Sequence, residues 1–191
     1  MSAERLQAFS DGVIAILITI LVLELKVPHG ADGEALRPLL PVFLTYVLSF
    51  VYLGIYWSNH HHMFQVVERV NGAILWANLH LLFWLSLIPF TTGWMGENHF
   101  APLPTALYGT VLLMAAIAYT ILQATILAYR EAGSVLAEAV GRDAKGKVSM
   151  LAYAVAIPIA FASQWIADAL YIGVALLWLV PDRRIESRVV R

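Results

Sequence analysis

The sequence contains no cysteine and little charge. Of its 191 residues, 13% are charged and 60% are hydrophobic, and the mean hydropathy is +0.74. The absence of cysteine excludes disulfides, thiolate metal sites and cysteine nucleophiles. A soluble domain has about a quarter of its residues charged, so this chain has roughly half the charge that a water-facing surface needs. The composition therefore predicts an integral membrane protein.

Six apolar segments could cross a bilayer core, which takes about 20 helical residues. They cover residues 5–26, 38–62, 72–95, 102–130, 147–166 and 168–181. The last two leave little room for a turn around Gln164 and Asp168; we interpret them as a tight hairpin, with one bent re-entrant unit as the alternative. No linker or soluble segment divides the chain. Residues 1–191 are thus predicted to form a single all-α domain with six transmembrane helices.

The distribution of basic residues predicts the orientation. With six spans, the N-terminus, the 63–71 and 131–147 loops and the C-terminus share one side, and that side holds ten of the twelve lysines and arginines. Only Lys26 and Arg37 lie on the other side. Cationic loops stay cytoplasmic, so we expect a multi-pass protein of the cell membrane with both termini in the cytoplasm. Glu4 and Arg5 lead into the first segment without a small-residue cleavage site, so we expect that helix to be retained.

The first segment has two unlike faces. Asp11 stands inside its apolar run, where a charged side chain is costly and marks a functional or assembly site. One face, at i, i+3, i+4 and i+7, carries Ile16, Thr19, Ile20 and Leu23. At about 100° per residue, Asp11 lies roughly 140° around the helix from Ile16. We expect the Asp11 face to be held by protein and the opposite face to be apolar with one hydroxyl.

A motif surrounds this aspartate. It reads R-x-x-x-F-S-D and consists of Arg5, Phe9, Ser10 and Asp11. The motif and the run FSDGVIAILITILVLELKVP resemble the first helix of the transmembrane-protein-175 family, which comprises lysosomal and prokaryotic potassium channels, and specifically its bacterial branch. The segments YWSNHHHMF at 56–64 and SLIPFTT at 86–92 are also similar to that family. About half of the chain carries the resemblance.

The resemblance implies a homotetramer of six-helix subunits whose first helices surround a central ion path. Carried over by position, stacked constrictions and a hydroxyl ring would be formed by Ile16, Thr19, Ile20 and Leu23. The signature residues and structural ties would be Arg5, Phe9, Ser10 and Asp11. Their candidate partners on the second and third segments are Trp57, Asn59, His60, His61 and Asn78. Which histidine is the partner stays open at this stage.

The function expected from this arrangement is a potassium-preferring cation channel. The chain has no T-V-G-Y-G run, so a filter of backbone carbonyls is not available. A hydrophobic constriction formed by the first helix makes ions shed part of their water, which potassium does more easily than sodium, and it can gate by dewetting. We expect K⁺ and other monovalent cations, the lipid bilayer and further copies of the chain as partners, with no nucleic acid and no cofactor.

Two other functions are alternatives to the channel. A proton- or ion-coupled secondary transporter would use Asp11 as a relay, but such proteins have internal repeats, and the two halves of this chain show no convincing one. An enzyme would need a nucleophile beside a base, and the sequence offers no such pair. The run from His60 to His62 does not predict a metal site, because adjacent helical residues point about 100° apart.

Overall fold

The computed structural model describes residues 2–65, 67, 69–129 and 144–179. Apart from one bridge between Ser2 and Arg69, the regular structure of these residues is helical. The elements are α1 (Ala3–Leu21), η1 (Val22–Glu24), η2 (Gly33–Leu39), α2 (Leu40–Phe64), α3 (Gly72–Ser86), α4 (Ile88–Glu97), α5 (Pro102–Ala128), α7 (Ala144–Ile159) and α8 (Gln164–Leu179). The predicted all-α class is confirmed.

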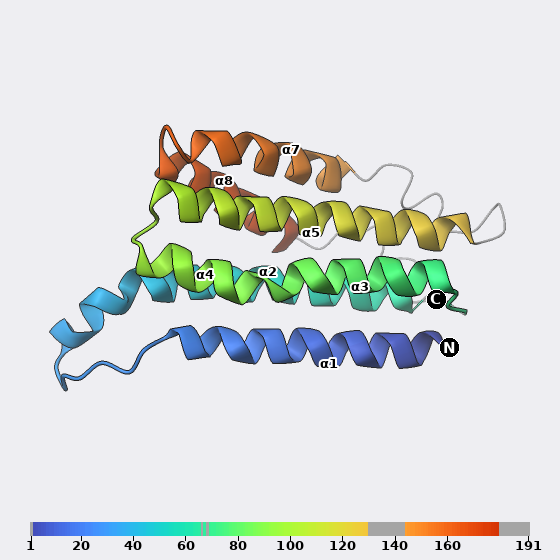
Figure 1. The fold of residues 1–191 in the computed structure, drawn as a ribbon, viewed down its shortest axis with the longest axis horizontal. Coiled ribbons are helices and arrows are strands. Elements are labelled where there is room, and N and C mark those ends of the chain that lie inside the picture. The colour runs from blue at the N-terminus through green and yellow to red at the C-terminus, as the bar shows by residue number, and fades with distance from the viewer. Residues whose placement is uncertain (1, 66, 68, 130–143, 180–191) are drawn as a thin grey trace.

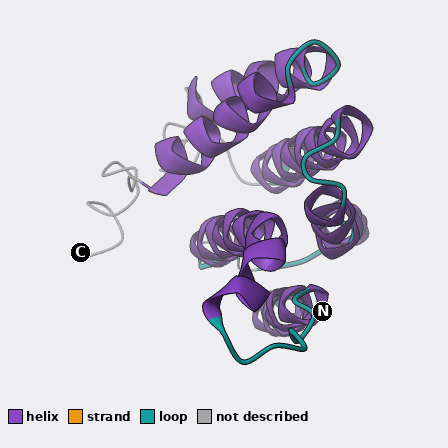
Figure 2. Ribbon diagram, turned by 90° about the vertical axis from the view of Figure 1, so that its left-hand side faces the viewer, coloured by secondary structure: helices purple, strands orange, loops and turns teal. Residues whose placement is uncertain are grey.

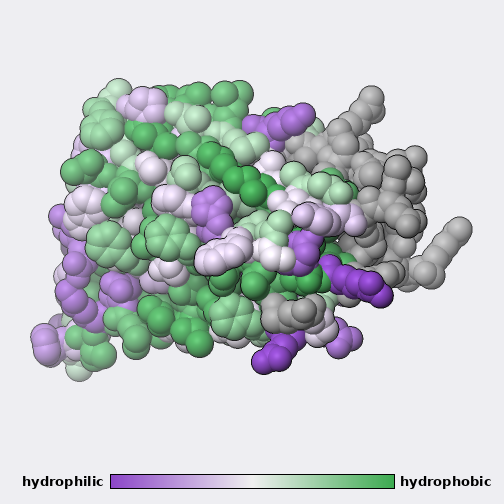
Figure 3. Space-filling view, turned by 45° about the vertical axis from the view of Figure 1, so that its right-hand side comes forward, coloured by the Kyte–Doolittle hydropathy of each residue, from purple (hydrophilic) through white to green (hydrophobic). Residues whose placement is uncertain are grey.

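Among the residues that the structure describes, four helical stretches are long and apolar enough to cross a membrane. They are Ala3–Glu24, Gly33–Phe64, Gly72–Glu97 and Pro102–Ala128, while α8 is apolar but has only 16 residues. Hydrophobic residues cover much of the face seen in Figure 3, and hydrophilic ones gather at its left edge and beside the grey region. Length, hydropathy and surface agree that the protein is embedded in a membrane.

The helices lie side by side, and successive spans run in opposite directions. The starts of α1 and α3 share one end of the bundle with the ends of α2 and α5, and the shorter α7 and α8 run in opposite directions beside α5 (Figure 1). Viewed along the bundle in Figure 2, α1 occupies one edge, the α7–α8 hairpin occupies the opposite edge, and the other helices lie between them. Of the basic residues expected on one side, Arg5 and Arg69 are at this shared end, and Lys145 and Lys147 are at the start of α7; Arg130, Arg142 and the arginines from 183 to 191 lie outside the described residues.

The last two helices differ from their predicted bounds. The turn between them falls at residues 160–163 and not near Asp168, because α7 ends at Ile159, one residue after Pro158. A proline has no backbone N–H to donate, so it disfavours continuation of the helix around it. Backbone hydrogen bonds from Ile166 and Ala167 to the Ser163 carbonyl then begin α8. Two helices of 16 residues form a hairpin that packs on α5.

The third span is broken after α3. Leu87 separates α3 from α4, and Pro89 occupies the first turn of α4, where the missing N–H leaves no hydrogen bond unmade. Thr91 and Thr92 donate their hydroxyls back to main-chain carbonyls in that turn. The break sets α4 against α2 and α1.

A close approach of α2 and α4 makes Gly96 sensitive to substitution. A Cβ at Gly96 would lie 2.7 Å from Val42 Cα, which is backbone and cannot move aside. We expect Gly96→Ala to destabilise the protein by about 1–3 kcal/mol through overpacking. Gly173→Ala is the matched control, since a Cβ there meets nothing within 4 Å, and it should stabilise α8 by roughly 0.5–1 kcal/mol. Thermal unfolding in detergent measures both; equal midpoints for the two variants would contradict this packing.

Candidate functional site

Helix α1 buries one face and exposes the other. The buried face, at helical spacing, consists of Ala3, Leu6, Ser10, Ile14, Leu17 and Leu21. The exposed face, here called the α1 stripe, consists of Phe9, Gly12, Ile16, Thr19, Ile20 and Leu23. The buried face packs on α2, α3 and α4, so the subunit itself leaves the α1 stripe uncovered.

The α1 stripe contains the four residues predicted to line an ion path. Ile16 is 59% exposed, Ile20 is 37% exposed and Leu23 is 75% exposed. Thr19 is also exposed, and its hydroxyl donates to the Ile16 carbonyl at 2.8 Å. Because the proton of this hydroxyl is engaged in the helix, its oxygen offers lone pairs to whatever faces the stripe.

A buried polar chain ties α1 to its two neighbours. His60 Nε2 of α2 donates to Asn78 Oδ1 of α3 at 2.7 Å, and Asn78 Nδ2 donates to Ser10 Oγ of α1 at 2.9 Å. Ser10 then donates to the Leu6 carbonyl at 2.9 Å. All three side chains are fully buried, so each bond replaces one that water would otherwise supply. Sequence analysis named Ser10, His60 and Asn78, and the structure brings them together.

The second histidine binds a residue that sequence analysis missed. Gln7 Nε2 lies 2.7 Å from His61 Nδ1, which links α1 to α2 a second time. Gln7 precedes Ser10 by three residues and Asp11 by four, so its position on the polar face of α1 was the available signal. The two histidines thus have separate partners, one on α3 and one on α1.

Two candidate partners lie outside this network. Trp57 is 46% exposed, and its ring centre is 6.1 Å from that of His61. Asn59 donates to the Ile55 carbonyl of its own helix at 2.8 Å. They were expected to join the motif because their segment resembles the family, but the described residues show no hydrogen bond from either side chain to α1 or α3.

Arg5 and Asp11 were expected to be structural ties, but within the described part of the subunit neither side chain forms a hydrogen bond to another helix. Arg5 is exposed, and only its backbone N–H is bonded, to the N-cap side chain of Ser2. Asp11 is half-buried, and its Oδ1 is buried without a hydrogen-bond partner among these residues. The carboxylate is near enough to His60 for an electrostatic interaction. A buried oxygen of this kind requires a partner from elsewhere, such as water or another chain.

The described residues contain no group of three or more histidine and acidic side chains that could hold a metal ion. In the run from His60 to His62, the first side chain is buried, the second is half-buried and the third is exposed. The three rings therefore diverge.

Two contacts hold the segment after α1 against α4. The Glu24 carboxyl packs on Gly93, where a Cβ would lie 2.2 Å from Glu24 Oε2. Lys26 Nζ donates to Glu97 Oε1, one helical turn further along α4. This hydrogen bond and the charge of Glu97 raise the pKa of Lys26 above its ordinary value of 10.5. Glu24 and Lys26 thereby link the segment after α1 to α4, the second helix of the third span.

The raised pKa of Lys26 fixes how this pair should respond to pH. A lysine whose pKa is higher in the folded state stabilises that state below 10.5 and loses the effect as pH rises through the folded value. We expect Lys26→Gln to lower the unfolding temperature slightly at pH 7–9, and the difference to disappear in high salt or once the pH exceeds the raised pKa of Lys26. Lys147→Gln, at an exposed lysine of α7, is the control. A difference that persists in high salt would show that the pair does not act electrostatically.

Comparison with known protein families places the first three spans in one family. The family model described as "Endosomal/lysosomal potassium channel TMEM175" matches residues 5–89. These residues include the motif, the α1 stripe and the polar chain through His60 and Asn78. A curated potassium channel of Chryseobacterium sp. (strain P1-3) is 55% identical over 98% of this chain and 97% of its own length. One from Streptomyces collinus is 39% identical over 60% of each chain.

The solved structures contain a similar fold. The crystal structure of a lysosomal potassium-selective channel TMEM175 homolog from Chamaesiphon minutus superposes with a TM-score of 0.81. The match covers 93% of this chain and 96% of that one, at 29% sequence identity. The similarity therefore extends over α5 and the α7–α8 hairpin, where the sequence alone showed a likeness only in length and hydropathy.

Proposed function

This chain belongs to the TMEM175 family and is a potassium channel, and we propose that its ions pass along the α1 stripe. The observation that carries the proposal is the division of α1 into a packed face and an uncovered face. Exposure alone does not separate a pore from a lipid-facing surface, since Trp76 and Phe83 of α3 are exposed as well. The α1 stripe differs from these because it combines apolar residues with Gly12 and Thr19, on a helix anchored by buried polar bonds on its other side.

The proposed channel contains four copies of the chain around one axis. A single edge helix cannot enclose a path, whereas cyclic symmetry brings identical stripes to face each other. The position of α1 at the edge of the bundle suits such an arrangement (Figure 2). We further propose six membrane spans per subunit, with α7 and α8 as the last two and both termini in the cytoplasm. Four of the six described lysines and arginines support this orientation, because Arg5, Arg69, Lys145 and Lys147 lie at or just before the starts of α1, α3 and α7, whereas Lys26 and Arg37 lie between α1 and α2.

Stacked apolar rings would give a modest preference for potassium. In the proposed path Ile16, Ile20 and Leu23 form constrictions, and the Thr19 oxygen faces the ions between them. An ion that passes an apolar ring sheds part of its hydration, and potassium holds water less tightly than sodium does. The same rings would gate by dewetting.

Asp11 is proposed as a structural group and not as a relay for coupled transport. Its unpartnered Oδ1 faces away from the α1 stripe, in range of His60. A neighbouring copy or water would supply the missing hydrogen bond.

Potassium flux from liposomes, together with the mass of the purified protein, tests the proposal. Four chains of 21.1 kDa give about 84 kDa of protein. We expect that mass, and a potassium flux driven by the potassium gradient alone. Flux that requires an opposing proton gradient would favour the coupled transporter, and a stable monomer would exclude the ring.

A further inference from the structure

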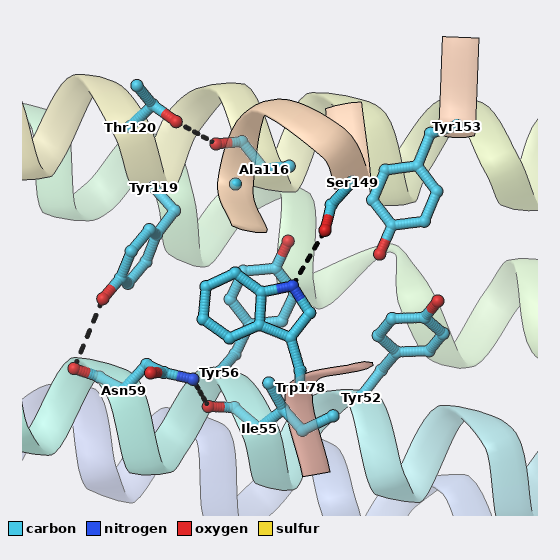
Figure 4. A pocket seen from close by; sticks show the side chains of 11 residues that line it. Tyr52, Ile55, Tyr56, Asn59, Ala116, Tyr119, Thr120, Ser149, Tyr153 and Trp178 are labelled. Carbon is cyan, nitrogen blue, oxygen red and sulfur yellow. Dashed lines mark hydrogen bonds between the residues drawn. The ribbon is translucent and has the colours of Figure 1, made fainter. Parts of the chain in front are cut away.

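A cavity lies between α2, α5, α7 and α8, and α2 separates it from α1 (Figures 1 and 4). Five aromatic side chains from these four helices make most of its wall, namely Tyr52, Tyr56, Tyr119, Tyr153 and Trp178. On α2, the direction of His60, which begins the polar chain of the motif, is about a quarter turn around the helix from the mean direction of the residues that line the cavity. The cavity therefore belongs neither to the proposed ion path nor to the motif network.

Small residues create the space. Ala116 of α5 and Gly146 and Ser149 of α7 line the cavity where larger side chains would fill it. The volume within which the centre of a water molecule can move is about 40 Å³. A cavity needs about 10–15 Å³ of this volume to hold one water. Adding a water radius on every side gives roughly 150–200 Å³, the size of cavity that holds a benzene ring.

Most polar atoms of the wall are already bonded to protein. Trp178 Nε1 donates to Ser149 Oγ at 2.9 Å, and the Ser149 hydroxyl donates to the Lys145 carbonyl at 2.8 Å. The Tyr119 hydroxyl reaches the Asn59 carbonyl at 3.4 Å (Figure 4). The Asn59 side chain donates through Nδ2 to its own helix, and its Oδ1 accepts no hydrogen bond from the described residues. The wall thus offers ring faces, tyrosine hydroxyls and the amide oxygen of Asn59.

The charges of the described residues around the cavity favour a neutral ligand over a cationic one. No acidic side chain is among the described residues of the wall. At its edge, Lys145 Nζ lies 6.0 Å from the centre of the Trp178 ring, so a positive charge already occupies the aromatic surface there. A second cation would be repelled, whereas a neutral ring would not.

We propose that this cavity binds small neutral aromatic molecules that carry one hydrogen-bond donor, the chemistry of phenol or indole. The ring stacks against the tyrosine and tryptophan faces, and the donor binds Asn59 Oδ1. A lipid chain could fill the space but would leave this oxygen without a partner. Because Asn59 and His60 are adjacent on α2, an occupant contacts the helix that holds α1.

Fluorine NMR of the purified, assembled channel tests the site with 4-fluorophenol as the probe and fluorobenzene as its analogue without a donor. We expect saturable binding of 4-fluorophenol, about fivefold tighter than that of fluorobenzene. Ala116→Phe, which fills the cavity, should abolish it, while Ala124→Phe, at an exposed position of α5, should not. If Ala116→Phe does not assemble, Ala116→Leu should weaken binding in proportion to the smaller volume that it fills.

Two results would overturn the proposal. Binding that is absent, or unchanged when Ala116 is enlarged, would show that the cavity is not the site. Equal affinity for the two probes would show that Asn59 recognises no donor and that the space is merely apolar. Neither measurement uses ion flux, so a failure here is separate from a failure of the pore assignment.

Discussion

Replacing Ile16 or Ile20 with asparagine is expected to increase potassium flux roughly three- to tenfold, equivalent to lowering the barrier by about 1 kcal/mol, and to weaken the preference for K⁺ over Na⁺. In the proposed tetramer, four amides would replace four branched apolar side chains and hold water in the neck, so the ion would lose less of its hydration. A wetted ring also loses the dewetted, closed state. The measurement is single-channel conductance in planar bilayers, with reversal potentials under K⁺ and Na⁺ gradients.

The control is Ala15→Asn. Ala15 is exposed like Ile16 but lies about 100° around the helix from Ile16 and about 140° from Ile20, at the border of the α1 stripe. The same amide at this position should leave conductance and selectivity near those of the unaltered channel.

The two rings act in series, so the narrower one limits the flux. One single variant is therefore expected to show most of the effect, and the double variant should exceed both. If conductance and reversal potential stay unchanged in both single variants and in the double variant, α1 does not line the path.

The faces of α1 could be predicted from the sequence because they depend on helical period alone. Residues at i, i+3, i+4 and i+7 share a face in any α-helix, so the stripe from Ile16 to Leu23 follows once the segment is helical. The class of protein was equally accessible, because hydropathy and the small number of charges determine it.

The partners of the motif could not be predicted fully because they depend on how helices pack. Helical period places His60, His61 and Asn59 about 100° apart, but only the positions of α1 and α3 decide which of them meets Asn78 or Gln7. Asn59 turned toward a cavity whose other walls come from α5, α7 and α8. Those helices carried no recognisable motif, and the cavity had no signal in the sequence.

The largest expected loss of stability comes from Asn78→Leu. The substitution keeps the branching and the number of heavy atoms of the side chain but removes both an acceptor and a donor from a fully buried site. His60 Nε2 then loses its acceptor and Ser10 Oγ loses its donor. Because His60 Nδ1 already has no partner among the described residues, the whole buried ring is left without a hydrogen bond. A buried polar group without a partner costs about 1–3 kcal/mol. We expect a loss of about 2–4 kcal/mol, measured by unfolding in detergent.

Asn98→Leu is the control for this substitution. Asn98 is exposed after α4 and donates only to the Trp94 carbonyl, so its replacement should change stability by less than about 0.5 kcal/mol.

Combining Asn78→Leu with Ser10→Ala separates the energy of the hydrogen bond from the cost of burial. If the two residues act through their 2.9 Å hydrogen bond, the double variant loses less stability than the sum of the singles. Hydrogen bonds between membrane helices average about 0.6 kcal/mol because the unfolded helix finds other partners in the bilayer. A coupling energy near that average would mean that α1 is held mainly by the packing of Leu6, Ile14 and Leu17. A clearly larger coupling energy would mean that the polar chain sets the position of α1.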